Sequence, residues 1–161
     1  MQPKIVLLQS KKLIGKRMRM ALSENRTYAL WHSFMKQRKE IQNQIGKDLF
    51  SIQIYDKALN MTDFNQDTFF EKWAATAVSC FDFVPNDMEI IKLPAGLYAV
   101  FVHKGDSTTF PKTMDFIFKE WLPESEYAFE YRPQFEVLGE KYKNNDPDSE
   151  EEVWIPIKRK G

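Results

Sequence analysis

The chain has 161 residues, a length that suits one domain, and its 23 Lys and Arg are balanced by 23 Asp and Glu. A formal net charge of zero argues against a nucleic-acid-binding protein, which usually carries a basic face. The single cysteine, Cys80, excludes an internal disulfide, and no apolar run suits a signal peptide or a membrane span. We therefore expect a cytoplasmic protein that binds neither nucleic acid directly nor a membrane.

The first half of the chain predicts two strands, a helix and two more strands. Apolar residues in 5–8 and 13–20 predict two strand segments with a kink near residues 10–12. Residues 23–25 offer N-caps for an amphipathic helix whose apolar positions recur as far as Ile45, and Gly46 ends it. Alternation in 49–55 and the β-branched and aromatic content of 70–80 predict two further strands, joined by a surface connection.

The second half repeats this order. Strands are expected over 88–93 and 97–103, with a kink at residues 94–96 between them. An amphipathic helix opens around residues 107–111 and ends at Pro123. A strand near 128–140, centred on residues 131–136, is joined to a closing strand over 152–157 by a charged hairpin tip.

The repeated order predicts an α+β fold in a single domain over residues 1–161. We expect a tandem duplication of a β-β-α-β-β unit, with pseudo-repeats at about 1–84 and 85–161. The two units would form one antiparallel sheet with both main helices on one face and a central pocket between the halves. Aromatic residues make up 14% of the chain, which indicates either an aromatic-lined pocket or a dense core.

Glu136 is the candidate functional residue, because a carboxylate in an apolar strand needs a partner or a purpose. It could bind a flat cation by Coulomb attraction, with aromatic faces adding roughly 0.5–2 kcal/mol each. The alternative is that Glu136 points outward and pairs with a lysine. The sequence has no Ser-His-Asp or Cys-His arrangement, and His32 and His103 are expected to be structural or solvated. We expect no cofactor, and the spacing of metal-ligating residue types predicts no metal site.

Four segments in order resemble the GyrI-like effector-binding domain. This module binds small molecules in gyrase-inhibitor-like proteins and in the C-terminal halves of multidrug-responsive AraC- and MerR-type activators. The resemblance is closest over residues 88–157 and looser, by topology, over 1–87. The segments are 91–105 (IKLPAGLYAVFVHKG), 120–123 (EWLP), 133–136 (PQFE) and 153–157 (VWIPI).

The resemblance implies two SHS2-type repeats around a hydrophobic pocket with one buried acid, which carries over to Glu136. Aromatic residues from both halves line such pockets. Many relatives carry a tyrosine two residues after the acid, where this chain has Leu138. The matching ligand-binding candidates beside Glu136 are Trp31, Phe34, Tyr98, Phe101, Trp121 and Phe135.

Three functions are compatible with the sequence and the resemblance. We favour a stand-alone protein that senses or sequesters a small hydrophobic, aromatic or cationic molecule, since 161 residues leave no length for a helix-turn-helix domain. The first alternative, implied by some relatives, is a hydrolase of strained, cyclopropane-bearing genotoxic natural products, with Glu136 as general base and Tyr98 orienting the substrate. The second is a gyrase-inhibitor-like interaction protein with an unidentified protein partner.

Overall fold

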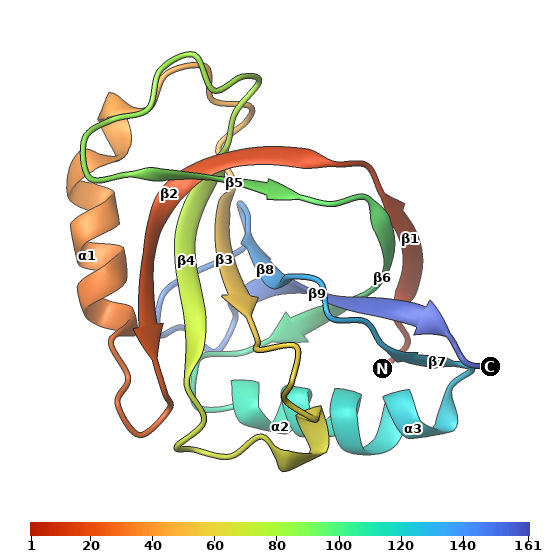
Figure 1. The fold of residues 1–161 in the computed structure, drawn as a ribbon. Helices are drawn as coiled ribbons and strands as arrows, with labels where there is room; N and C mark the ends of the chain where they lie inside the picture. The colour runs from red at the N-terminus through yellow and green to blue at the C-terminus, as the bar shows by residue number, and fades with distance from the viewer.

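One antiparallel sheet with two main helices packed on it forms the protein, in a computed structural model that describes residues 1–161 (Figure 1). The α+β class expected from the sequence is confirmed. No helix is long and apolar enough to cross a membrane. The strands are β1 (Lys4–Leu8), β2 (Lys11–Met20), β3 (Leu49–Ile54), β4 (Phe70–Ala77), β5 (Glu89–Leu93), β6 (Gly96–Lys104), β7 (Tyr127–Phe129), β8 (Gln134–Leu138) and β9 (Glu150–Arg159). The helical segments are α1 (Thr27–Gln37), η1 (Arg38–Glu40), η2 (Met61–Asp63), α2 (Phe110–Asp115), η3 (Phe116–Trp121) and α3 (Leu122–Glu124).

The strand order of the sheet has a pseudo-twofold pattern, in which each strand of the first half of the chain corresponds to one strand of the second half. The order is β1-β6-β9-β8-β3-β4-β2-β5, with β7 paired only to β9. Exchanging β1 with β5, β2 with β6, β3 with β8 and β4 with β9 reverses this order. Strands β3 and β8 therefore form the central pair. Each half contains the order β-β-α-β-β, with β7 as an addition, and the duplication itself stays a prediction.

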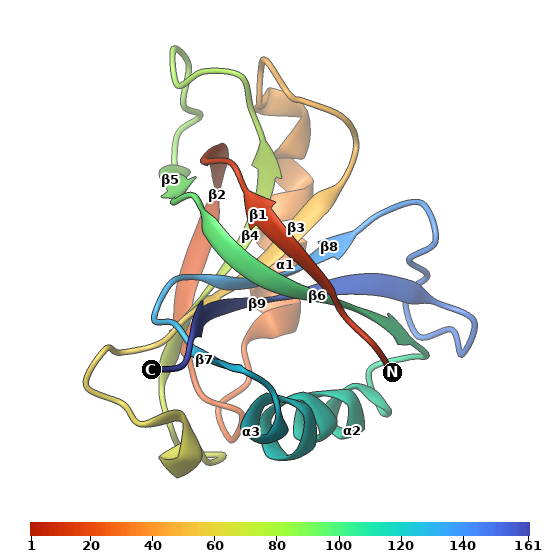
Figure 2. The same cartoon turned by 90° about the vertical axis from the view of Figure 1, so that its right-hand side faces the viewer.

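Two opposed breaks bend the sheet and join its ends. Residues 9–10 separate β1 from β2, and residues 94–95 separate β5 from β6. On one side of the breaks Leu8 lies opposite Gly96, and on the other Lys11 lies opposite Leu93. The two bent strands thus arch together across the molecule, and β1 runs along β6 (Figures 1 and 2). Both kinks expected from the sequence are confirmed.

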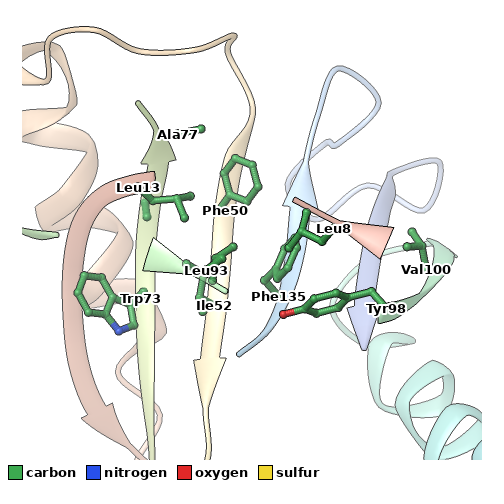
Figure 3. Packing of buried hydrophobic residues seen from close by; sticks show 11 residues of the cluster. Leu8, Leu13, Phe50, Ile52, Trp73, Ala77, Leu93, Tyr98, Val100 and Phe135 are labelled. Carbon is green, nitrogen blue, oxygen red and sulfur yellow. The ribbon is translucent and has the colours of Figure 1, made fainter. Parts of the chain in front are cut away.

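The inner face of the bent sheet holds the central hydrophobic core. Side chains from the two halves point toward one another there (Figure 3). Phe135 stacks on Trp154 with ring centroids 5.2 Å apart, and Tyr98 meets Phe135 edge to face at 5.3 Å. Much of the aromatic content therefore belongs to a dense core. The cluster comprises Leu8, Leu13, Phe50, Ile52, Trp73, Ala75, Ala77, Leu93, Tyr98, Val100 and Phe135.

The two main helices, α1 and the continuous segment α2–η3–α3, lie on the other face of the sheet, which we call the helix face. Ala74, Ser51, Glu136 and Val153 lie directly opposite one another on β4, β3, β8 and β9, so they share one face of the sheet. Ala74 belongs to the buried cluster that contains Leu30 and Phe34 of α1. Val153 belongs to the cluster under α2, η3 and α3. The expected placement of both helices on one face is confirmed, and Glu136 lies between them.

The first helix is shorter than its apolar spacing predicts. It ends at Gln37 and is followed by the 3₁₀ turn η1, after which Ile41 is extended, although its side chain is still buried. The chain turns at Asn43 and Gly46, which both have positive φ, and the Ile45 N–H donates to the carbonyl of Ala77. Pairing with β4 thus replaces further helical turns, and Ile45 is exposed. The apolar residues keep helical spacing as far as Ile45, but the helix ends earlier. Ile41 fills a core position from the loop that follows the helix.

The second helix contains a wide turn that the sequence did not predict. Between α2 and α3 the residues of η3 are π-helical, and the helix continues through Pro123 to Glu124. A proline inside a regular helix removes one hydrogen bond and collides with the carbonyl four residues earlier. The π-helical residues end at Trp121, two residues before Pro123, and the helix ends at Glu124, within one residue of the expected end.

The strand expected over residues 128–140 is two strands with a break between them. Strand β7 pairs with the end of β9, whereas β8 pairs with an earlier part of β9 and with β3. Pro133 has no N–H for a ladder, and the Arg132 N–H donates to the carbonyl of Glu130 in the connection. The guanidinium of Arg132 donates to the carbonyls of Leu97 and Ile157. Residues 131–133 therefore lie outside the sheet.

Candidate ligand-binding site

A strip of polar side chains crosses the helix face between the two helical segments. Gln53 on β3 lies directly opposite Lys72 on β4 and Gln134 on β8. In the next row along these strands Ser51 lies opposite Glu136. Alternation along β9 puts Glu151 on the same face as Val153, which is the partner of Glu136. We call Ser51, Gln53, Lys72, Gln134, Glu136 and Glu151 the polar strip.

The polar strip contains two buried acceptor atoms without a partner. Glu136 is 5% exposed and Gln134 is 2% exposed. The Nε2 of Gln53 donates to Glu136 Oε1 at 3.1 Å and to Ser51 Oγ at 3.3 Å. Glu136 Oε2 and Gln134 Oε1 receive no hydrogen bond. Buried polar atoms are nearly always paired, so these two acceptors mark a place for a hydrogen-bond donor or a cation.

Burial and neighbouring charges shift the pKa values of this strip. Burial raises the pKa of Glu136 to about 7, although the charge of Lys72 and the hydrogen bond from Gln53 favour the charged carboxylate. Burial lowers the pKa of Lys72, and the two acids of the strip oppose that shift. No ion pair joins Lys72 to either acid. Glu136 is therefore neither outward-facing nor paired with a lysine, which excludes the alternative that the sequence left open.

Glu151 is a second acid in the strip that sequence reasoning missed. Burial and the charge of Glu136 raise its pKa to about 7, although Lys72 acts in the opposite direction. The residue seemed to belong to a solvated acidic loop, but β9 begins at Glu150, two residues before the expected strand. The signal was the alternation of Glu151, Val153 and Ile155, which places all three on one face.

An aromatic cluster adjoins the polar strip at the end of β3. Tyr55 lies 5.6 Å from Phe64, 5.8 Å from Phe70 and 6.4 Å from Phe129 between ring centroids. Burial raises the pKa of Tyr55, and the charge of Glu136 raises it further, so Tyr55 also lies near the acid. The hydroxyl of Tyr131 donates to the Leu59 carbonyl and ties the β3–β4 connection to this cluster. We define the aromatic cluster as Tyr55, Phe64, Phe70, Phe118, Phe129 and Tyr131.

A cavity of about 290 Å³ lies at the aromatic cluster, and Tyr55 is common to the cavity and the surroundings of Glu136. Two cationic side chains, Lys57 and Arg132, also line this cavity. A larger hollow of about 510 Å³ lies near the end of α1, but Met35 is its one apolar lining residue. We consider the smaller cavity the better candidate, because ligand pockets combine apolar walls with a few polar groups. Its lining is Ile54, Tyr55, Lys57, Pro94, Phe129, Tyr131, Arg132 and Pro133.

The expected aromatic residues do not form one pocket around Glu136. Phe135 and Tyr98 lie on the inner face of the sheet, because consecutive strand residues point to opposite faces and Tyr98 packs on Phe135. The hydroxyl of Tyr98 donates to the carbonyl of Pro133 at 2.7 Å. Their assignment beside Glu136 is therefore corrected. The aromatic side chain that the structure does place near Glu136 is that of Tyr55.

The remaining four candidates lie on the helix face, in two separate groups. Phe34 of α1 is fully buried against the sheet, and Trp31 of the same helix meets it edge to face at 5.8 Å. Phe101 and Trp121 meet at 5.1 Å under the second helix. The burial of Phe34 against the sheet therefore holds α1 on one side of the polar strip, and the Phe101–Trp121 contact holds the second helix on the other side. Contact with a ligand stays a prediction for them.

The two histidines have structural surroundings. His103 is 1% exposed, and its Nδ1 lies 2.7 Å from Thr113 Oγ1, which joins β6 to α2. His32 stacks on Tyr28 on the surface of α1. No group of three or more His, Cys, Asp or Glu residues is arranged to hold a metal ion.

The chain matches the GyrI-like small molecule binding domain over residues 1–158 and belongs to this family. SAV2435 bound to tetraphenylphosphonium superposes with a TM-score of 0.74 at 15% identity, covering 98% of this chain and 94% of that one. The C-terminal domain of EcmrR gives 0.72 at 13% identity, over 99% of this chain and 98% of that one. A hydrolase from Listeria innocua gives 0.60 at 9%, over 98% and 92%. No curated protein matches the chain. At these identities the solved structures show a shared fold.

Proposed function

We propose that this protein binds an amphipathic small molecule whose cationic group lies on the polar strip and whose aromatic part lies against the aromatic cluster. The observation that carries the proposal is the enclosed carboxylate of Glu136, whose Oε2 has no partner. The family binds small molecules, and the fold is shared with SAV2435, which binds the lipophilic cation tetraphenylphosphonium.

The proposed binding energy comes from compensating a buried carboxylate. An unpaired charge in a protein interior is costly, and a ligand cation removes much of this cost. At 4 Å and an effective dielectric constant of about 20, the attraction is about 4 kcal/mol. Each aromatic face over the cation adds roughly 0.5–2 kcal/mol. Such a site selects for positive charge and aromatic surface rather than for one molecular shape.

Access to Glu136 requires movement, because Glu136 is only 5% exposed, whereas Lys72 and Glu151 in the same strip are partly exposed. We propose that the cavity of about 290 Å³ receives the aromatic part first and that Tyr55 then turns away from the strip. The β3–β4 connection would move with it, because the Tyr131–Leu59 hydrogen bond holds that segment. Lys57 and Arg132 line the cavity, so the ligand would place its cation at the acids and not in the cavity.

Tetraphenylphosphonium and the neutral triphenylphosphine oxide provide the test, followed by tryptophan fluorescence at pH 8. The wild-type protein should bind the cation, and Glu136→Gln should weaken cation binding by about 30-fold or more, which corresponds to about 2 kcal/mol. Glu152→Gln is the matched control, since it removes the same charge from β9 on the other face. Equal losses for the cation and the neutral compound would contradict the proposal, as would failure of the wild type to bind either.

A hydrolase is the second candidate function. A carboxylate with a pKa of about 7 suits a general base near neutral pH, and the fold is shared with a hydrolase from Listeria innocua. Tyr98 cannot orient a substrate at Glu136, because it lies on the inner face, whereas Tyr55 is close to the acid. Incubation with a cyclopropane-bearing alkylating compound would show turnover, and turnover unchanged in Glu136→Gln would exclude this base. Docking to a protein partner such as gyrase stays a prediction from the resemblance.

A further inference from the structure

We propose that Lys72 and Glu151 set the charge of the ligand and make the polar strip a site for a ligand with one positive charge. This inference rests on the proposed function, because it concerns the charge of the molecule that Glu136 receives. The inference assigns roles to two residues outside the four segments that resemble the family. Lys72 lies before the first segment, and Glu151 lies just before the last one.

The three charged groups come from three strands and share one face of the sheet. Lys72 on β4 faces the same side as Gln53, which bonds to Glu136 on β8. Glu151 on β9 is two residues from Val153, the direct partner of Glu136. Lys72 lowers the pKa of both acids, both acids raise the pKa of Lys72, and the charge of Glu136 raises the pKa of Glu151. They therefore behave as one electrostatic unit between the two helices.

The charge of this unit in its ionised state is minus one. Glu136 and Glu151 contribute two negative charges, and Lys72 contributes one positive charge. A monocation brings the site to zero, a dication leaves it at plus one, and a neutral ligand leaves it at minus one. Because the interior penalises uncompensated charge, the monocation forms the most favourable complex.

Lys72 offsets one acid without occupying the place of the ligand. Its ammonium forms no ion pair with either carboxylate, and Glu136 Oε2 stays unpartnered. The adjacent Gln134 Oε1 is also free, so two buried acceptors remain for a ligand. The lysine thus reduces the net charge of the strip while leaving its acceptors available, and it repels a second positive charge on a ligand.

Three flat ligands of similar size test the charge rule at pH 8, where the acids are mostly ionised. They are 4-phenylpyridine (neutral), N-methyl-4-phenylpyridinium (one charge) and N,N′-dimethyl-4,4′-bipyridinium (two charges), measured by calorimetry and tryptophan fluorescence. The wild-type protein should bind the monocation about tenfold or more tightly than the dication. Tetraphenylphosphonium serves as a bulkier monocation in the same assay.

Lys72→Met should reverse or abolish the preference of the monocation over the dication, because the strip then carries two negative charges. Lys72→Arg is the matched control, since it keeps the positive charge and should keep the preference. Glu151→Gln should weaken binding of the monocation about tenfold. The ratio of the affinity for the monocation to that for the neutral compound should therefore decrease. Circular dichroism and thermal unfolding of each variant verify that it is folded.

The possible results separate this inference from the proposed function. If the wild type binds none of the cations, including tetraphenylphosphonium, both are overturned. If it binds monocations but Lys72→Met and Lys72→Arg show the same charge preference, the charge rule is wrong while the binding function stands. Wild-type affinity for the dication equal to that for the monocation would also overturn the rule.

Discussion

Replacing Glu136 by glutamine should stabilise the protein at pH 8 and have little effect at pH 4. The pKa of Glu136 is about 7 in the folded protein, against 4.5 for an unperturbed glutamate. The folded state therefore holds the proton more tightly than the unfolded chain. Stability falls as pH rises from about 4.5 to about 7 and stays low above this window, because the folded state then contains a buried charge.

The size of the gain follows from the pKa difference. A pKa of about 7 against 4.5 corresponds to about 3 kcal/mol at pH 8, which is an upper limit for the variant. Removing the carboxylate also takes a favourable partner from Lys72, while it relieves the repulsion on Glu151. Tyr55, directly after β3, has a raised pKa and is neutral at pH 8, so removing the charge of Glu136 leaves it unaffected. We expect a net stabilisation of about 1–3 kcal/mol at pH 8.

Urea unfolding of the wild type and Glu136→Gln at pH 4, 5, 6, 7 and 8 measures this effect. For a chain of this length the gain corresponds to a rise of about 2–12 °C in the unfolding temperature at pH 8. Glu152→Gln is the control, because it removes the same charge outside the polar strip. A Glu136→Gln variant that is equally stable or less stable at pH 8 would refute the reasoning. A gain in stability together with a loss of cation affinity would show that Glu136 lowers stability but is needed for binding.

Three further substitutions test other parts of the structure. Trp121→Ala should lower the free energy of unfolding by about 3 kcal/mol in urea titrations, with a small effect on ligand affinity, whereas an effect mainly on affinity would make Trp121 a pocket wall. Gly15→Ala should cost about 3 kcal/mol or more, because its Cβ would lie 2.1 Å from the Ala74 carbonyl oxygen, and an unaffected unfolding midpoint would contradict this close approach. Tyr131→Phe should remove the bond to the Leu59 carbonyl, destabilise the protein by about 1 kcal/mol and speed ligand association in stopped-flow measurements, whereas an unchanged association rate would exclude this bond as a restraint on entry.

Glu136 could be found from the sequence because its signal is local. A carboxylate inside an apolar strand is unusual whatever the rest of the chain does. Its partners could not be found in this way, since Lys72 and Glu151 lie far away in the sequence and meet it through the register of β4, β3, β8 and β9. The resemblance grouped Phe135 with Glu136, although the alternation of a strand separates neighbouring side chains.

Local patterns also predicted the order of strands and helices and the kinks near residues 10 and 95, because alternation and proline act over a few residues. The same patterns failed where long-range pairing was stronger, as in the segment that holds Ile45, which pairs with the end of β4. They also missed the π turn before Pro123. What only the tertiary structure decided is the environment of the acid: burial raises its pKa, and strand pairing brings a lysine and a second glutamate to its side.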